Sequence, residues 1–236
     1  MRILLFVLLF SFSCTSPQPD QRSMAQTASA TVQIPVSSYI ELKESIITNR
    51  KMLHAKYHSL AALNSRAAKE ELSNFWVNNI SNEFFNKWAN TAWDFNGTTE
   101  QPGQGAIACG YFVTTILRDM DCKINRNKLA ICASSQMMKA LTATQKIKNL
   151  SYLSHQSFDE KIRQLGKGVY IIGLDFHTGF IVNDGIENWF IHSYYVKRVG
   201  VIKEKLIDSR ALRSSKTKWM VSLTNDKDFL FKWLKG

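Results

Sequence analysis

The spacing of apolar residues changes once along this chain, from a helical repeat to strand-like runs. Residues 37–93 contain neither Gly nor Pro, and their apolar side chains recur three or four positions apart, as on one face of a helix. From Gly168 onward, short runs rich in Val, Ile, Tyr and Phe are separated by turn residues, as in antiparallel strands. Helices followed by such strands predict an α+β fold.

Further helices and strands are expected after a loop near residues 93–105, which is rich in Gly, Thr and Gln. We expect helices near residues 110–120, 133–142, 157–165 and 229–234, and strands at 169–172, 179–182, 189–191 and 217–223.

The first residues have the form of a signal peptide. Arg2 precedes an apolar run that ends at Phe10, and this run is too short for a permanent membrane span. Cys14 stands where a bacterial lipoprotein is cleaved and acylated, and residues 14–35 have the polar composition of a flexible tether. We therefore expect a signal peptide over residues 1–13 and an exported bacterial lipoprotein, anchored in the membrane through Cys14 and facing the periplasm or the cell surface. The alternative is an ordinary signal peptide with an incidental cysteine.

Basic residues outnumber acidic ones, 30 against 19, and the formal net charge is +11. The excess is greatest over residues 186–236, which hold eleven Lys and Arg against five Asp and Glu. Export argues against nucleic acid as the partner of this region. Anionic envelope polymers or lipid headgroups are the expected partners, because opposite charges attract over long range. The alternative is a basic surface that serves solubility alone.

Four cysteines have to be assigned, at positions 14, 109, 122 and 132. If Cys14 is acylated, an oxidising compartment permits a bridge between Cys122 and Cys132 and leaves Cys109 free. The chain contains no Cys-x-x-Cys motif, and His54 and His58 are more typical of a helix surface than of a metal site. We expect neither a metal nor another cofactor.

Cys109 is the candidate nucleophile, because it begins a segment with a helical apolar face. Phe112, Val113 and Ile116 mark that face, and a loop containing Gly103 and Gly105 precedes the cysteine. The unpaired N–H groups and the positive dipole end of a helix N-terminus favour a thiolate, which is the form that attacks carbonyl carbons. Taken alone, however, a cysteine beside an apolar helix is more often a packing residue.

Two histidines can supply the general base. His177 and His192 lie on either side of the hairpin signal Asn183-Asp184-Gly185. If residues 184 and 185 form a two-residue loop, the two histidines are paired directly across the hairpin, with Cβ atoms about 5 Å apart. One imidazole can then orient the other, which gives a base and its orienting partner.

These motifs resemble those of the NlpC-like cell-wall cysteine peptidases. The resemblance rests on Cys109 at a helix start, on His177-Thr178-Gly179-Phe180 and on Phe190-Ile191-His192. It implies a papain-like catalytic domain over residues 88–236, preceded by a helical N-terminal region over residues 36–87. It also implies that peptide or amide bonds in peptidoglycan stem peptides are cleaved, with Cys109 as nucleophile, His177 as general base and acid, and His192 as the orienting third residue.

Other parts of the resemblance concern the residues around the nucleophile. The segment 93–99 is similar to the aromatic-and-glycine stretch that precedes the family's cysteine, which makes Trp93 and Asp94 candidate substrate contacts. Gln104 is similar in placement to the papain glutamine that helps to bind the oxyanion. Ala108 and Gly110 replace the Asp and Ser that usually flank the family's cysteine, which leaves the substrate preference open.

Two other classes of function fit the same sequence. One is a non-catalytic envelope lipoprotein that binds cell-wall peptides or acidic polymer. The other is an acyl-transfer enzyme on the same fold, such as a transglutaminase-like crosslinker. The oligomeric state does not follow from the sequence.

Overall fold

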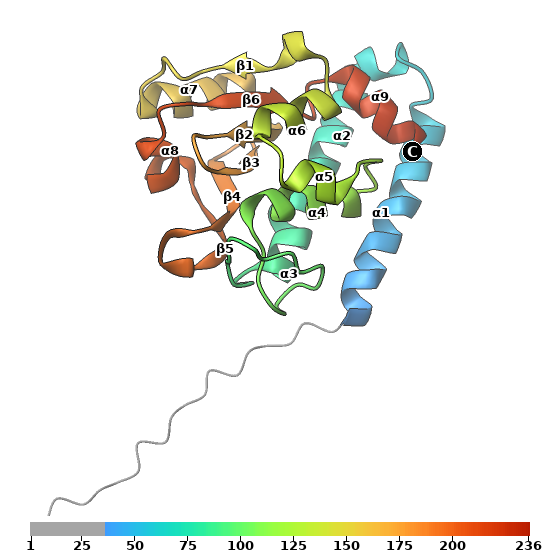
Figure 1. The fold of residues 1–236 in the computed structure, drawn as a ribbon. Helices are drawn as coiled ribbons and strands as arrows, with labels where there is room; N and C mark the ends of the chain where they lie inside the picture. The colour runs from blue at the N-terminus through green and yellow to red at the C-terminus, as the bar shows by residue number, and fades with distance from the viewer. Residues whose placement is uncertain (1–35) are drawn as a thin grey trace, which may run out of the picture. The chain divides into compact units, whose positions relative to one another are not determined.

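A computed structural model describes residues 36–236 of the chain (Figure 1). The predicted signal peptide, Cys14 and the predicted tether lie outside the described residues. Within residues 36–236, no helix is both long enough and apolar enough to cross a membrane.

Helices dominate the first half of the described chain and strands the second half (Figure 1). The helical elements of the first half are α1 (Val36–Lys56), α2 (Arg66–Asn78), the π-helical turn η2 (Asn79–Phe84), α3 (Phe85–Trp88), α4 (Cys109–Asp119), α5 (Arg126–Ala130) and α6 (Ser134–Leu141). The later helices are α7 (His155–Leu165), α8 (Arg210–Ser214) and α9 (Lys227–Lys235), and short 3-10 turns include η5 (Leu206–Asp208).

A six-stranded antiparallel sheet has the order β1-β6-β2-β3-β4-β5. Its strands are β1 (Lys148–Asn149), β2 (Gly168–Gly173), β3 (Thr178–Asn183), β4 (Asn188–Tyr194), β5 (Gly200–Lys205) and β6 (Trp219–Ser222). The predicted α+β class, with helices first and an antiparallel sheet later, is therefore confirmed. The strand β5 was not expected from the sequence.

Apolar side chains cover both faces of the sheet. Successive residues of β2 lie on opposite faces of the sheet, so Val169 belongs to one buried cluster and Tyr170 to another. One cluster contains residues of α2, α4, α6 and α9, and the other contains residues of α7 and α8. Strands that are buried on both faces read as continuous apolar runs, which explains why β2, β3 and β4 could be recognised from the sequence.

The helical N-terminal region shares its core with the rest of the described chain. Residues 36–236 all belong to one contact unit. Tyr39 of α1 donates a hydrogen bond to Asp119 of α4 at 2.6 Å and accepts one from the Trp88 indole at 2.8 Å. Trp76 of α2 continues this packing, because its ring contacts the Trp233 ring of α9. The segments 36–87 and 88–236 are therefore joined by buried contacts.

Cys122 and Cys132 are free thiols in the structure, so the permitted bridge between them is not formed. Each sulfur has a different environment. Cys122 is buried and lines a pocket with Lys232 and Trp233, whereas the Cys132 Sγ donates a hydrogen bond to the Leu129 carbonyl at 3.3 Å.

Candidate active site

Cys109 is the first residue of α4, as the sequence predicts. The preceding loop is held by backbone hydrogen bonds from Ile107 to Ala92 and from Ala108 to Gly97, both 2.8 Å long. Gly97 is required at this crossing, because a Cβ there would lie 2.6 Å from the carbonyl carbon of Ala106. The loop thus brings the chain into the helix with Ala108 still extended, and it fixes where the thiol lies.

Gly110 explains one departure from the family pattern. A Cβ at this position would lie 2.1 Å from the carbonyl oxygen of Ala130, so no larger residue fits without moving the backbone. A serine after the cysteine is excluded by this contact. The close approach also sets the end of α5 against the start of α4, beside the nucleophile candidate.

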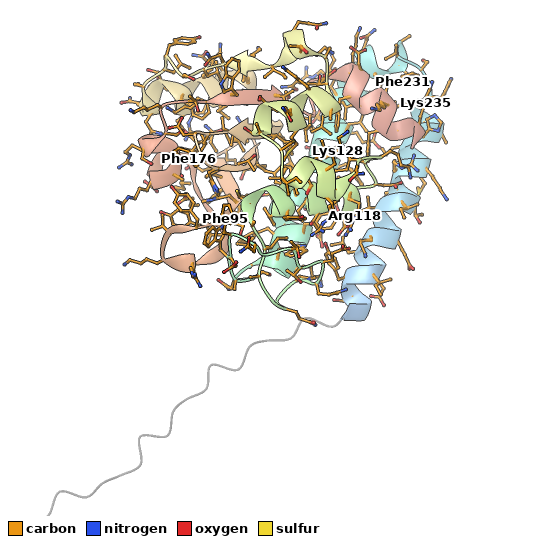
Figure 2. The ribbon with its side chains drawn as sticks, in the orientation of Figure 1. Phe95, Arg118, Lys128, Phe176, Phe231 and Lys235 are labelled. Carbon is orange, nitrogen blue, oxygen red and sulfur yellow. The ribbon has the colours of Figure 1, made fainter. Side chains whose placement is uncertain are left out.

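A pocket of about 220 Å³ opens beside Cys109. Its lining includes His177, which is buried, and Cys109, which is partly exposed. Residues from the end of α5 to α6 and from the loop between β2 and β3 also line the pocket. Phe176, next to His177 in this lining and labelled in Figure 2, is 97% exposed. The thiol and one imidazole, 68 positions apart in the chain, therefore share a space that is open to solvent.

The Cys109 thiol is protonated at rest. Burial raises the pKa of Cys109, and hydrogen bonds from the backbone N–H groups of Thr178 and Gly110 only partly oppose that effect. A base is therefore needed to generate the thiolate.

The two histidines contact each other as the sequence predicts, but in a different register. The Nε2 atom of His177 lies 2.7 Å from Nδ1 of His192, and both side chains are buried. The β3–β4 pairing joins Phe180 to Ile191, so the connecting loop has four residues, and continuing this register sets Gly179 opposite His192. The predicted direct pairing of His177 with His192 is thus wrong by two positions. Strand side chains repeat every two residues, so both histidines still lie on the same face.

Glu204 is the third member of this hydrogen-bonded group, and the sequence did not predict it. Its Oε1 atom lies 3.1 Å from Nε2 of His192. The side chain comes from β5, where Glu204 is paired with Phe190 across the β4–β5 ladder. The sequence gives little signal for this strand, because Gly200 is followed by the apolar pair Val201 and Ile202 and then by three consecutive charged residues at 203–205.

Electrostatics keep both imidazoles neutral near pH 7. Burial lowers the pKa of His177 well below its usual value, and the neighbouring His192 lowers it further. Burial also lowers the pKa of His192, although Glu204 opposes this effect. For Glu204, burial would raise the pKa, yet hydrogen bonds with His192 and Ser209 hold it below its usual value. Two neutral rings and one carboxylate therefore form the resting group.

The Nδ1 atom of His177 is the unused end of this group. It is buried, and it has no hydrogen-bond partner among the described residues. His177 lines the same pocket as Cys109, and no hydrogen bond joins the two side chains in the structure. Catalytic hydrogen bonds are often long before substrate binds and tighten in the complex.

The other candidate residues differ in how near the site they lie. The Trp93 ring centroid is 6.3 Å from that of Tyr195, which is in turn 5.2 Å from the His177 ring, so this aromatic chain reaches the site. Asp94 accepts a hydrogen bond from the Asn96 backbone and lies 3.8 Å from the Arg198 guanidinium. Gln104 is exposed in a separate turn and does not line the Cys109 pocket, so the structure does not bring it to the site.

Within residues 36–236, no group of three or more His, Cys, Asp or Glu side chains is arranged to hold a metal ion. Comparison of the chain with protein families, with curated proteins and with solved structures found no match.

Proposed function

We propose that this protein is an exported cysteine hydrolase of the NlpC-like type, with a papain-like catalytic core, that cleaves peptide or amide bonds in peptidoglycan stem peptides. One observation carries the reaction type. The thiol at the start of α4 shares an open pocket with His177, whose Nδ1 atom has no hydrogen-bond partner among residues 36–236 and whose Nε2 atom is hydrogen-bonded to a second histidine. A nucleophile, a base and a group that orients the base are the parts that thiol hydrolysis requires.

Cys109 acts as the nucleophile in this reaction, and His177 transfers the protons. The Nδ1 atom of His177 takes the Cys109 proton, and the thiolate attacks the carbonyl carbon of the scissile bond. The backbone N–H of Cys109 at the helix start is suited to stabilise the resulting oxyanion. His177 returns its proton to the leaving amine, and a thioester remains. The same imidazole then activates a water molecule, which hydrolyses the thioester to a carboxylic acid and regenerates the thiol.

The substrate class comes from the sequence resemblance and from the predicted export. Lipidation at Cys14 would hold the enzyme at the membrane, facing the cell wall. The basic region 186–236 would attract anionic envelope polymers towards the protein. Trp93 and Asp94 are the proposed substrate contacts, since the aromatic chain from Trp93 leads to His177.

Digestion of purified cell-wall fragments tests this function. The wild-type protein should release fragments whose masses correspond to the addition of water across one peptide or amide bond. Cys109→Ala should release none. Cys122→Ala is the matched control, because it removes a buried thiol that does not line the proposed active-site pocket, and it should digest as the wild type does. Digestion that survives Cys109→Ala, or its absence with folded wild type, contradicts the proposal.

A binding module is the second candidate, and the raised pKa of Cys109 favours it. The two candidates differ in how the thiol reacts with limiting iodoacetamide. A catalytic thiol beside an unpaired imidazole should be alkylated at Cys109 near neutral pH. A binding module should show no reaction near neutral pH, and its thiol reactivity should rise only at or above the ordinary range near pH ~8–9. An acyl-transfer enzyme would instead join an added amine to the cleaved carbonyl, which intact-product masses would detect.

A further inference from the structure

The Glu204 carboxylate lies at the end of a line of hydrogen-bonded side chains that leads towards the nucleophile. It is 23% exposed, whereas His192 and His177 behind it are buried. The distances along this line are 3.1 Å from Glu204 to His192 and 2.7 Å from His192 to His177. Each link joins one specific ring nitrogen, so the line fixes where the imidazole protons must be.

The proton positions follow from donor and acceptor chemistry. An ionised carboxylate only accepts hydrogen bonds, so Nε2 of His192 must carry a proton and donate it to Glu204. A neutral imidazole has a single N–H, so Nδ1 of His192 is an acceptor. The Nε2 atom of His177 must therefore be its donor. That leaves Nδ1 of His177 unprotonated, and this atom has no hydrogen-bond partner in the part of the chain that the structure describes.

We propose that Glu204 is a positioning residue that sets the tautomer of both histidines and so keeps Nδ1 of His177 ready to take the Cys109 proton. This inference rests on the proposed thiol-hydrolase function and adds a fourth residue to it. In the opposite tautomer, Nδ1 of His177 would carry a proton and could not act as the base. A base held in the wrong tautomer loses orders of magnitude in rate.

The carboxylate also serves the charged state of the reaction. When His177 takes the thiol proton it becomes an imidazolium, and its Nε2–H still donates to His192. The negative charge of Glu204 lies behind that link and stabilises the positive ring through it. The hydrogen bonds from His177 to His192 and from His192 to Glu204 keep their direction throughout the reaction. His177 returns to its neutral form when its Nδ1 proton passes to the leaving amine.

Other groups that face Glu204 must be considered in any pH experiment. Ser209 hydrogen-bonds with the carboxylate, and His155 of α7 is near enough to lower the pKa of Glu204 by its charge. Burial raises the pKa of Tyr194 of β4, and the negative charge of Glu204 raises it further. These groups surround the carboxylate end of the line.

The test compares Glu204→Leu and Glu204→Gln in the mature chain, with Glu160→Gln as the control. Glu160 is an exposed carboxylate of α7 that accepts a hydrogen bond from Gln156 of the same helix. Two-bond proton–nitrogen spectra of ¹⁵N-histidine-labelled protein report the tautomers directly. The rate of Cys109 alkylation by iodoacetamide between pH 5 and pH 9 reports the base. A merely structural role would not change the tautomers of a variant that remains folded.

We expect both site histidines to be Nε2–H tautomers in the wild type and in Glu160→Gln. The amide oxygen of Glu204→Gln can still accept from His192, so this variant should keep the tautomers and lose less than about tenfold in alkylation rate at pH 7. Glu204→Leu should show mixed tautomers and a rate about 10²-fold lower, the scale of a lost general base. If the Leu variant does not fold, the tautomers of the wild type decide, because an Nδ1–H form of either site histidine overturns the inference.

Two results would overturn the inference. One is an Nδ1–H tautomer of either site histidine in the wild type. The other is a folded Glu204→Leu protein with wild-type tautomers and a wild-type alkylation profile. The proposed function fails separately: if wall fragments stay intact while the Glu204 dependence of tautomer and alkylation holds, the substrate class is wrong and the positioning role stands.

Discussion

Gly179 controls whether the two histidines can meet, and Gly179→Ala should break their contact. A Cβ at this position would lie 2.7 Å from Cε2 of Phe190, 2.8 Å from Cβ of His192 and 2.9 Å from the Ile191 carbonyl oxygen. Two of these atoms belong to backbone or to a Cβ, so they cannot move without shifting β4. We expect the shift to move His192 away from His177.

The size of the effect follows from these contacts. Overpacking a buried site costs about 1–3 kcal/mol. Loss of the buried hydrogen bond between His177 and His192 adds about 0.5–1.5 kcal/mol. The free energy of unfolding should therefore fall by about 2–4 kcal/mol, the sum of the central parts of these ranges. Urea denaturation followed by tryptophan fluorescence measures this change.

The control is Gly185→Ala in the turn between β3 and β4. Gly185 has a φ of 97°, which destabilises alanine, but the nearest atom to an added Cβ is the Lys167 Cδ at 3.7 Å. This variant should lose about 1–2 kcal/mol of stability and keep the wild-type alkylation profile of Cys109. Gly179→Ala should lose both stability and fast alkylation. A Gly179→Ala protein with the wild-type urea midpoint and the wild-type alkylation profile would refute the packing argument.

Three further outcomes follow from buried polar groups. Tyr39→Phe removes a hydroxyl that bridges a buried indole and a buried carboxylate, and it should lower the free energy of unfolding by about 1–3 kcal/mol; an unchanged thermal midpoint would contradict this. The folded-state pKa values of His177 and His192 are lowered, so the unfolded chain binds protons at these rings more readily than the folded protein does. The free energy of unfolding should therefore be highest above the unfolded pKa near ~6.5 and should decrease as the pH falls below it, by up to about 1.4 kcal/mol per pH unit for each ring. Urea titrations between pH 7 and pH 5 should show this slope, and a His177→Asn, His192→Asn double variant should not. Arg126→Lys loses paired hydrogen bonds to two carbonyls of the loop before the nucleophile, so unfolding should require about 1–3 kcal/mol less and alkylation should slow; wild-type values of both would show that this tie is dispensable.

Most of the framework could be predicted because burial produces strong patterns. The runs of β2, β3 and β4 are apolar on both sides, and α4 has a clear apolar face after Cys109. The contact between the histidines was predicted despite the register error, because a shift of two positions preserves the face of every side chain. A shift of one would have separated the rings.

The register itself depends on turn chemistry that the pattern does not reveal. The Asp184 carboxylate accepts hydrogen bonds from the backbone of Ile186 and Glu187, and the Asn183 side chain accepts one from Gly185. These contacts stabilise a four-residue loop where Asp-Gly alone predicts two residues.

Glu204 escaped prediction because β5 is an edge strand. Edge strands carry charged residues that protect their open side, and β5 reads Gly-Val-Ile-Lys-Glu-Lys. Its three charged residues are consecutive, so β5 lacks the alternation of apolar and polar residues that identifies a strand in a sequence. The residue at the end of the proposed proton line therefore lies in the part of the sheet that is hardest to recognise.

The proposed centre is assembled from parts that come together at different separations along the chain. His177 and His192 are 15 residues apart, and Glu204 follows His192 by 12, so neighbouring hairpins alone can join these three. The sulfur arrives from 68 residues upstream and is placed only when its helix docks on the finished sheet. Long-range docking of this kind is slow compared with hairpin formation. The complete centre therefore exists only in the fully folded protein, and a partly folded polypeptide in which α4 has not docked lacks the base beside the thiol.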